Sequence, residues 1–260
     1  MLLRPPSQAF RAVLLVGAFL SGCASYARFP SAAPNSPTLT AAVYRPDATT
    51  PRPAVVLLHP CGGIDPFVND WARWLTNEGY VALVLDSFTP RGVTSVCGTG
   101  RGPTMLDADA DAFGALRYLR SLPFVDGERV GVIGFSFGGG AALLASRAGY
   151  QWLRTPEKGF RAAVAFYPPC ELAGTDTTTP LLMLLAGADD WTPPSLCITI
   201  GKILERERTP VRWMVYPNAP HGFDQPGPPR TYLGHYMAYD ASATADAQRQ
   251  VRQFLAEFLR

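Results

Sequence analysis

The sequence predicts an α/β protein with one doubly wound, mostly parallel sheet in a single domain. Short apolar runs rich in β-branched residues alternate with helical patterns, and short connections leave no obvious second domain. The apolar runs are continuous rather than alternating, as expected of strands covered by helices on both faces. With 260 residues, 47% of them hydrophobic and 17% charged, the chain can bury a sizeable core.

The start of the chain has the pattern of an export signal. Basic residues precede a short apolar run, and Leu-Ser-Gly-Cys follows at residues 20–23. This tetrapeptide resembles the bacterial lipobox, in which the cysteine is lipidated and becomes the first mature residue. We therefore predict a signal peptide over 1–22, a lipid anchor to the membrane at Cys23, and a periplasm-facing or outer-membrane location in the bacterial envelope. An uncleaved anchor helix or an ordinary secretory signal is the alternative.

The next segment, 23–37, is small and rich in Pro and Ser, a composition typical of a flexible tether. The folded domain is therefore predicted over 38–260. Cleavage of the leader would remove two arginines and no acidic residue, which leaves 21 basic residues of the original 23 against 21 acidic ones. No basic patch remains to indicate a nucleic-acid partner.

The remaining elements follow from the apolar periodicity. An edge strand at 38–44 precedes a buried strand at 53–59, a helix at 65–78 and a buried strand at 80–85. A glycine-rich loop at 87–103 comes next, and a loop of this length is usually functional or held by a crosslink. After the loop we expect a helix at 105–119, strands at 129–135, 160–167, 180–185 and 211–216, and helices at 137–147, 194–208 and 245–259.

The stretch Gly134-Phe135-Ser136-Phe137-Gly138 matches G-x-S-x-G between a predicted strand and a predicted helix. This context is that of a nucleophile elbow, in which the serine occupies a sharp turn and glycines on each side avoid backbone clashes. The dipole of the following helix favours a developing oxyanion. The pattern predicts an α/β-hydrolase fold with Ser136 as nucleophile, and a purely structural glycine turn is the alternative.

A serine nucleophile needs an acid and a base, which follow it in that order in this fold. Two histidines follow Ser136: His221 comes directly after the last predicted strand, whereas His235 lies in a Tyr-rich stretch and is expected to be packed or exposed. Asp189 and Asp190 end the strand that starts at 180. Spacing to the next proline favours Asp189 as the acid, with Asp190 capping the next helix. The predicted triad is Ser136, Asp189 and His221.

Four stretches together resemble the dienelactone hydrolase family: LLHPCGG near Leu57, the elbow GFSFGGG, GADDWTP at the acid and PHGF at the histidine. The resemblance spans Val55 to Phe258 and implies a compact hydrolase of small esters or lactones, with no large lid and no cofactor. The founding enzymes have a cysteine where this chain has Ser136. They also have a loop glutamate where this chain reads HPCG at 59–62. These departures favour a broader serine esterase over an enzyme specific for dienelactone.

The resemblance also implies an oxyanion hole formed by the backbone N–H groups of Cys61 and Phe137. The mature chain has four cysteines after Cys23, and export to an oxidising compartment favours their pairing in disulfides. The chain has no CxxC motif, so a zinc site has little support. Three pairings are formally open. Cys61–Cys97 would clamp the oxyanion loop and Cys170–Cys197 would bridge near the acid. Free thiols or a catalytic Cys61 are the alternatives.

Two charged features of the middle of the chain allow competing interpretations. Arg91, in the long loop, is predicted either to hold an anionic substrate group or to form a structural salt bridge. Residues 107–111 imitate the start of an EF-hand loop, but the required glycine and bidentate glutamate are missing. Acidic residues in the first turns of a helix interact favourably with its dipole, so no metal site is predicted.

These observations predict an envelope-anchored hydrolase that cleaves small carboxylic esters or lactones through an acyl-enzyme. Ser136 attacks, His221 transfers the proton and Asp189 orients the histidine. One alternative keeps this machinery for peptide or polyester substrates. Another is a catalytically idle domain that serves as a binding lipoprotein, which the complete Ser-Asp-His set argues against.

Overall fold

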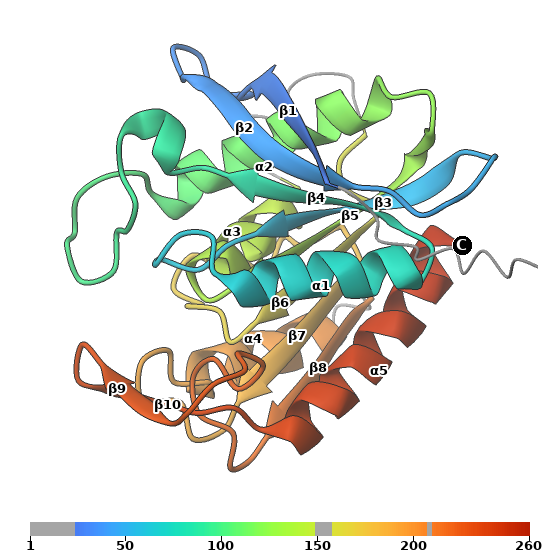
Figure 1. Cartoon of the computed structure of the whole chain (residues 1–260). Helices are drawn as coiled ribbons and strands as arrows, with labels where there is room; N and C mark the ends of the chain where they lie inside the picture. The colour runs from blue at the N-terminus through green and yellow to red at the C-terminus, as the bar shows by residue number, and fades with distance from the viewer. Residues whose placement is uncertain (1–23, 149–157, 207–209) are drawn as a thin grey trace, which may run out of the picture.

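An eight-stranded sheet forms the centre of the computed structural model, which describes residues 24–148, 158–206 and 210–260 (Figure 1). Its strands are β1 (Ser25–Pro30), β2 (Thr38–Tyr44), β3 (Arg52–Leu58), β4 (Val81–Asp86), β5 (Val125–Phe135), β6 (Ala162–Phe166), β7 (Leu181–Ala186) and β8 (Val211–Tyr216). Their order across the sheet is β1-β2-β4-β3-β5-β6-β7-β8. Strands β4, β3, β5, β6, β7 and β8 are parallel to one another, and β2 is antiparallel to β4. The predicted α/β fold with a mostly parallel sheet is confirmed.

Helices cover both faces of this sheet. They are α1 (Pro66–Asn77), α2 (Met105–Arg120), α3 (Phe137–Ala145), α4 (Ser195–Arg206) and α5 (Ala241–Leu259), with a short 3-10 turn at Thr89–Arg91. Helices α1 and α5 lie on one face, and α2, α3 and α4 lie on the other (Figure 1). Successive side chains of a strand point to opposite faces, so Val56 and Leu58 pack in one core cluster while Val55 and Leu57 pack in the other.

The flexible tether predicted for 23–37 is wrong for residues 25–30, which form β1. This strand pairs with β2 along its whole length, from Ser25↔Val43 to Pro30↔Thr38. Its alternate residues Ala27 and Phe29 are buried, and Phe29 stacks on Tyr118 of α2 with ring centroids 4.8 Å apart. The Pro-rich and Ser-rich composition belongs mainly to the turn that follows, so the sheet begins at residue 25 and not at 38.

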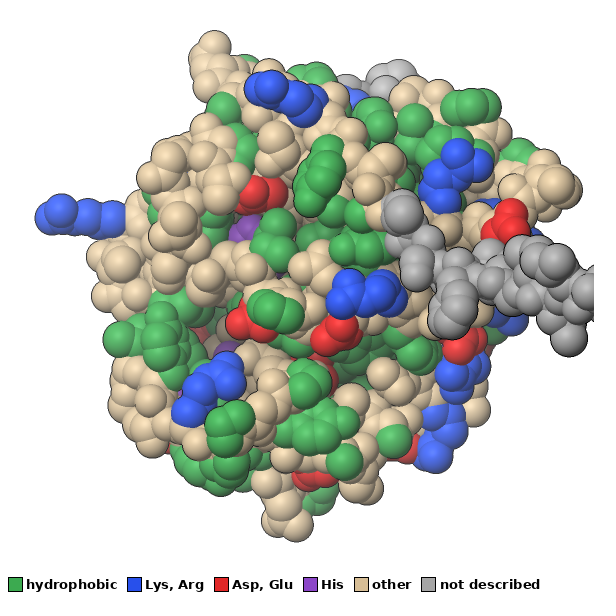
Figure 2. All heavy atoms as spheres, viewed as in Figure 1, with side chains coloured by type: hydrophobic (Ala, Val, Ile, Leu, Met, Phe, Trp, Pro, Cys, Tyr) green, Lys and Arg blue, Asp and Glu red, His purple; other side chains and the backbone are tan. Residues whose placement is uncertain are grey.

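The structure does not describe residues 1–23. The signal peptide predicted over 1–22 and the lipidated Cys23 fall outside the described residues. Within the part of the chain that the structure describes, no helix is long and apolar enough to cross a membrane. Figure 2 shows basic and acidic side chains interspersed over one face of the molecule.

Element boundaries shift by a few residues where capping groups decide them. Helix α5 begins at Ala241, earlier than the predicted 245, because Asp240 accepts a hydrogen bond of 2.9 Å from the backbone N–H of Ala243. The hairpin of β9 (Arg230–Tyr232) and β10 (His235–Met237) was not predicted. Strands of three residues carry too little periodicity to be read from sequence.

The topology brings the functional loops together. The carboxyl ends of parallel strands meet at one edge of the sheet, and the loops that follow β3, β4, β5, β7 and β8 therefore converge there. Each sequence-predicted triad residue lies in one of these loops.

Candidate active site

The nucleophile elbow connects β5 to α3. Ser136 adopts φ 52° and ψ −113°, a conformation rare for a residue with a side chain, and its N–H donates to the carbonyl of Phe166 at 3.0 Å. A Cβ on Gly134 would lie 1.9 Å from the carbonyl oxygen of Gly138, and one on Gly138 would lie 2.3 Å from that of Leu58. Both flanking positions therefore require glycine for the turn to close.

The structure brings the three predicted triad residues together. His221 Nε2 lies 3.0 Å from Ser136 Oγ, and His221 Nδ1 lies 2.8 Å from Asp189 Oδ2. All three residues are buried. Of the two aspartates that the sequence left open, Asp189 is the one beside the histidine.

Asp189 is held by several donors as well as by His221. Its Oδ1 accepts the backbone N–H groups of Trp191 and Thr192, both at 2.9 Å. The hydroxyl of Thr192 lies 2.9 Å from Oδ2. Burial raises the pKa of Asp189, but the hydrogen bonds from His221 and the loop outweigh it, so the pKa lies below its ordinary value. An ionised carboxylate accepts Nδ1–H and leaves Nε2 free to take the proton of Ser136.

The sequence suggested that the neighbouring Asp190 caps the next helix, but α4 begins only at Ser195 and Asp190 does not cap it. Its Oδ1 lies 3.4 Å from His235 Nδ1, on the β9–β10 hairpin. His235 stacks on Trp191 with centroids 4.7 Å apart and planes 9° apart, and Trp191 in turn packs 5.0 Å from the ring of His221. His235 is therefore a packed imidazole, as expected, and it holds the hairpin against the acid loop.

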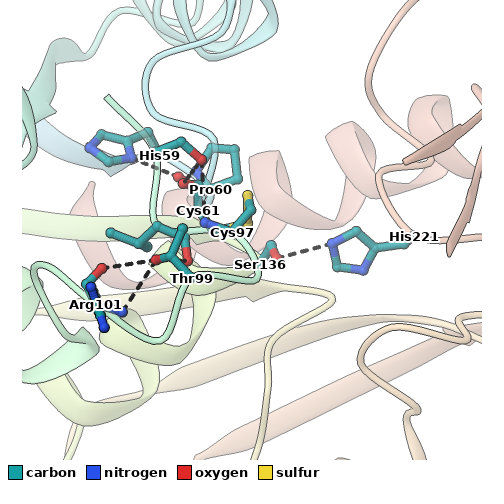
Figure 3. Close-up of a disulfide and its surroundings, with 10 residues drawn as sticks. His59, Pro60, Cys61, Cys97, Thr99, Arg101, Ser136 and His221 are labelled. Carbon is teal, nitrogen blue, oxygen red and sulfur yellow. Dashed lines mark hydrogen bonds between the residues drawn. A yellow bond between two sulfur atoms is a disulfide. The ribbon is translucent and has the colours of Figure 1, made fainter. Parts of the chain in front are cut away.

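Both predicted disulfides are present, Cys61–Cys97 and Cys170–Cys197. The first ties the loop after β3 to the long loop after β4, where the backbone N–H of Val96 also donates to the carbonyl of Cys61 at 2.9 Å. Figure 3 shows Ser136 between this bridge and His221. The bridge occupies the thiol of Cys61, so the alternative of a catalytic Cys61 does not fit this structure.

The oxyanion roles of the Cys61 and Phe137 N–H groups remain predictions, and the surroundings of both residues support them. Phe137 is the first residue of α3, where backbone N–H groups have no partner within the helix. Cys61 and Phe137 both line the space beside Ser136. Next to Cys61, buried His59 has Nδ1 2.8 Å from the carbonyl of Pro60, and burial lowers the pKa of this histidine. A neutral His59 thus donates to the loop that carries the predicted oxyanion donor.

Removing the Cys61–Cys97 bridge should impair catalysis as well as stability. The double substitution Cys61→Ser/Cys97→Ser is expected to cost about 3 kcal/mol of unfolding free energy, because it frees a long loop. It should also lower kcat by about tenfold or more, because a donor on a mobile loop is no longer fixed at the oxyanion. Urea unfolding and ester hydrolysis measure the two effects.

The matched control is Cys170→Ser/Cys197→Ser. The two bridges close segments of similar length, with sequence separations of 36 and 27. Similar losses of stability are therefore expected, with a smaller loss of kcat in the control. Equal kcat losses would show that the first bridge does not position the oxyanion loop.

Arg91 is part of a structural salt bridge and not of the substrate site. Its guanidinium binds Asp111 in a bidentate manner at 2.7 and 3.0 Å and also donates to the carbonyl of Ser87 at 2.7 Å. Asp111 is fully buried in α2, and Arg91 does not line either cavity at Ser136. The substrate-binding interpretation of Arg91 is therefore wrong, because a buried carboxylate already engages its donors.

The acidic run at 107–111 lies within α2, as expected, but its residues differ in role. Asp107 forms a capping box with Thr104 at the helix start. Asp109 and Asp111 were expected to interact with the helix dipole, but both are buried in the core. Burial raises the pKa of Asp109 well above its ordinary value. Among the described residues, no group of His, Cys, Asp and Glu is arranged to hold a metal ion.

Sequence reasoning missed Asp224, three residues after His221. Its Oδ2 accepts the indole N–H of Trp71 at 2.8 Å, and its Oδ1 accepts the hydroxyl of Tyr167 at 2.6 Å. The ring of Tyr167 packs 4.8 Å from that of His221. Asp224 therefore holds Tyr167 against the ring of His221, the predicted catalytic base. A single Asp in a Gly-rich and Pro-rich loop resembles a surface residue, and its partners are distant in sequence.

The protonation of Asp224 should make stability depend on pH. Burial raises its pKa to about 6, although hydrogen bonds from Tyr167 and Trp71 act in the opposite direction. An acid whose pKa is raised by folding destabilises the folded state once it ionises, so stability is lost as pH rises from about 4 to above 6. The unfolding free energy of the wild type relative to Asp224→Asn should fall by about 3 kcal/mol over that interval. Urea titrations of both proteins at the two ends of this pH interval measure the change. A free-energy difference between the two proteins that does not depend on pH would contradict the raised pKa of Asp224.

Two cavities open at Ser136, with volumes of about 440 and 610 Å³. The fold, the strained elbow and the Ser-His-Asp hydrogen bonds define a serine hydrolase of the α/β-hydrolase class. The profile of the dienelactone hydrolase family matches residues 39–259, and the chain belongs to that family.

Known proteins agree with this placement. The chain is 27% identical over 212 residues to the Bradyrhizobium sp. protein named "Probable 2-oxo-3-(5-oxofuran-2-ylidene)propanoate lactonase". The aligned region covers 74% of this chain and 81% of that protein. It is 28% identical over 119 residues to the carboxymethylenebutenolidase of Pseudomonas putida, and this alignment covers 40% of this chain and 48% of that enzyme. The structure of an esterase from Thermogutta terrifontis with propionate bound superposes with a TM-score of 0.65 at 18% identity, covering 89% of this chain and 94% of that one.

Proposed function

We propose that this protein hydrolyses small carboxylic esters or lactones through an acyl-enzyme formed on Ser136. The observation that carries the proposal is the unbroken chain of hydrogen bonds from Asp189 through His221 to Ser136, at the mouth of two cavities. Family membership and the lactonase named among the relatives support the same reaction class.

The proposed reaction has two halves. Ser136 Oγ attacks the carbonyl carbon while His221 Nε2 takes the proton, and the resulting oxyanion accepts the N–H groups of Cys61 and Phe137. His221 then gives its proton to the leaving oxygen. An ester releases its alcohol and leaves the acyl group on Ser136, whereas a lactone opens and keeps the new hydroxyl on the acyl group. Water attacks the acyl-enzyme with His221 as base, and His221 returns the proton to Ser136 Oγ as the acid is released. No cofactor takes part in these steps.

Covalent labelling tests this function directly. A fluorophosphonate probe should form one adduct with the wild-type protein, at Ser136, and none with Ser136→Ala. The wild type should also hydrolyse short-chain p-nitrophenyl esters. A wild-type protein that neither reacts with the probe nor turns over esters would instead be an idle hydrolase domain with a binding role.

We also propose that the mature protein is held at a bacterial membrane through a lipid on Cys23. The lipobox-like sequence supports this, and the topology gives it a consequence. Strand β1 is antiparallel to β2, which is antiparallel to β4, so Ser25 lies at the sheet edge opposite to Ser136. Only Ala24 separates Cys23 from β1. A lipid on Cys23 would therefore direct the active-site mouth away from the membrane, toward soluble substrates.

Detergent-phase partitioning tests the anchor. The full-length protein expressed in a bacterium should enter the detergent phase, whereas Cys23→Ser should stay in the aqueous phase. Recovery of both proteins in the aqueous phase would exclude the anchor without affecting the proposed chemistry.

A further inference from the structure

The two cavities at Ser136 differ in their chemistry. We propose that the natural substrate is an asymmetric ester with an apolar acyl chain of several carbons and a polar, hydroxyl-bearing alcohol. This inference rests on the proposed hydrolase function and names its substrate class. The cavity of about 610 Å³ is called the acyl cavity and that of about 440 Å³ the alcohol cavity.

The position of His221 decides which half of the ester enters which cavity. Its Nε2 must give a proton to the leaving oxygen, so the alcohol lies on the same side of Ser136 as the histidine. The alcohol cavity is lined by both Ser136 and His221. Cys61, one predicted oxyanion residue, lines both cavities, whereas Phe137, the other, lines only the acyl cavity, and His221 is not part of the acyl-cavity wall. The acyl carbon chain therefore extends into the acyl cavity.

The wall of the acyl cavity is mainly apolar. Its apolar side chains include those of Val96, Pro103, Met105, Phe137, Pro169 and Leu172, with Thr104 and Thr192 among the polar residues beside them. The two charged residues that line it, Arg101 and Glu171, are solvent-exposed. Its volume is in the range of pockets that bind drug-sized ligands, larger than an acetyl group requires. An apolar wall of this extent favours a hydrocarbon chain, with a gain in transition-state binding of about fourfold per buried methylene.

The alcohol cavity presents polar groups beside aromatic rings. Asp65 supplies a carboxylate, which also accepts the backbone N–H of Phe67 at 3.4 Å, and Arg230 supplies a guanidinium. Both residues are solvent-exposed, and both line the cavity with Ser136. The guanidinium of Arg230 is fixed by a hydrogen bond of 2.8 Å to the side-chain oxygen of Gln225. Trp191 and Tyr232 pack 5.8 Å apart on the same wall. A carboxylate and a guanidinium next to aromatic faces suit an alcohol that carries further hydroxyl groups.

Four esters that differ in one half at a time test the proposal: propyl acetate, propyl hexanoate, glyceryl monoacetate and glyceryl monohexanoate. For the wild type, kcat/KM should be about 10²-fold higher for hexanoates than for acetates. It should be about tenfold higher for glyceryl than for propyl esters, because each added hydroxyl finds a hydrogen-bond partner. The two preferences should be independent of each other.

Two variants should separate the halves. Leu172→Trp narrows the acyl cavity and should lower the hexanoate-to-acetate ratio of kcat/KM at least tenfold, with little change in the glyceryl-to-propyl ratio. Arg230→Met should lower the glyceryl-to-propyl ratio and leave the hexanoate-to-acetate ratio. Met214→Trp, at an exposed position of β8 outside both cavities, is the matched control and should change neither ratio.

The outcomes distinguish this inference from the function on which it rests. A wild type that reacts with the fluorophosphonate probe but hydrolyses all four esters equally would overturn the asymmetric-ester inference alone. The same holds if Leu172→Trp changes the alcohol preference and Arg230→Met the acyl preference. A wild type that neither reacts with the probe nor hydrolyses any ester would overturn the proposed function, and this inference with it.

Discussion

Replacing Ser136 by alanine should lower kcat for a short-chain p-nitrophenyl ester on the order of 10⁵-fold or more, with the fold unchanged. The substitution removes the hydroxyl Oγ, which lies 3.0 Å from His221 Nε2 and lines both cavities. The remaining activity would come from binding and from the oxyanion donors acting on water. Steady-state kinetics with purified protein, together with a thermal melt, measure the effect.

A second buried serine at the other end of α3 offers the control for this substitution. Ser146 lies next to the helix end and donates from its hydroxyl to the carbonyl of Leu143 at 2.7 Å. Ser146→Ala should cost a little stability and leave kcat within about twofold, because a lost local hydrogen bond is worth about 1 kcal/mol. Undiminished turnover in Ser136→Ala would refute the nucleophile, whereas a similar loss in both variants would indicate damage to α3.

The triad could be predicted from sequence because each member is tied to a local constraint. The elbow needs glycine at 134 and 138, and these stand directly after an apolar strand. Asp189 and His221 each follow the end of a strand, and parallel strands end at one edge of the sheet. Local pattern and chain order were therefore enough to predict that these distant residues meet. The sequence favoured Asp189 over Asp190, and the structure was needed to decide between them.

Features that depend on distant partners were missed or left open. Strand β1 exists because β2 offers it an edge, and the composition of its own neighbourhood resembles a tether. Asp224 is held by Trp71, 153 residues away, and by Tyr167, 57 residues away. The structural role of Arg91 depends on its pairing with Asp111, a residue of the acidic run at 107–111 that was expected only to interact with the helix dipole. In each case the local pattern is compatible with two environments, and tertiary contacts decide between them.

Asp189→Asn should lower kcat by about 10⁴-fold while KM changes little, because the substitution fixes the wrong tautomer of His221. In the wild type Oδ1 accepts the N–H groups of Trp191 and Thr192, and Oδ2 faces His221 Nδ1 at 2.8 Å. The amide of asparagine keeps its oxygen toward the two backbone donors and directs its NH₂ toward Nδ1. The imidazole proton then moves to Nε2, which points at Ser136 and no longer accepts its proton.

Asp190→Asn is the control for that substitution. It removes the same charge one residue away, from a carboxylate that contacts His235 and the backbone N–H of Tyr236 on the β9–β10 hairpin. Its kcat should remain within about threefold of the wild type. The rate of Asp189→Asn should recover partly at high pH, where hydroxide or an ionised serine bypasses the histidine, and the control should show no such recovery. Equal losses in the two variants would assign the effect to loop charge. A large loss confined to Asp189→Asn, with recovery at high pH, is the result that a tautomer-fixing acid requires.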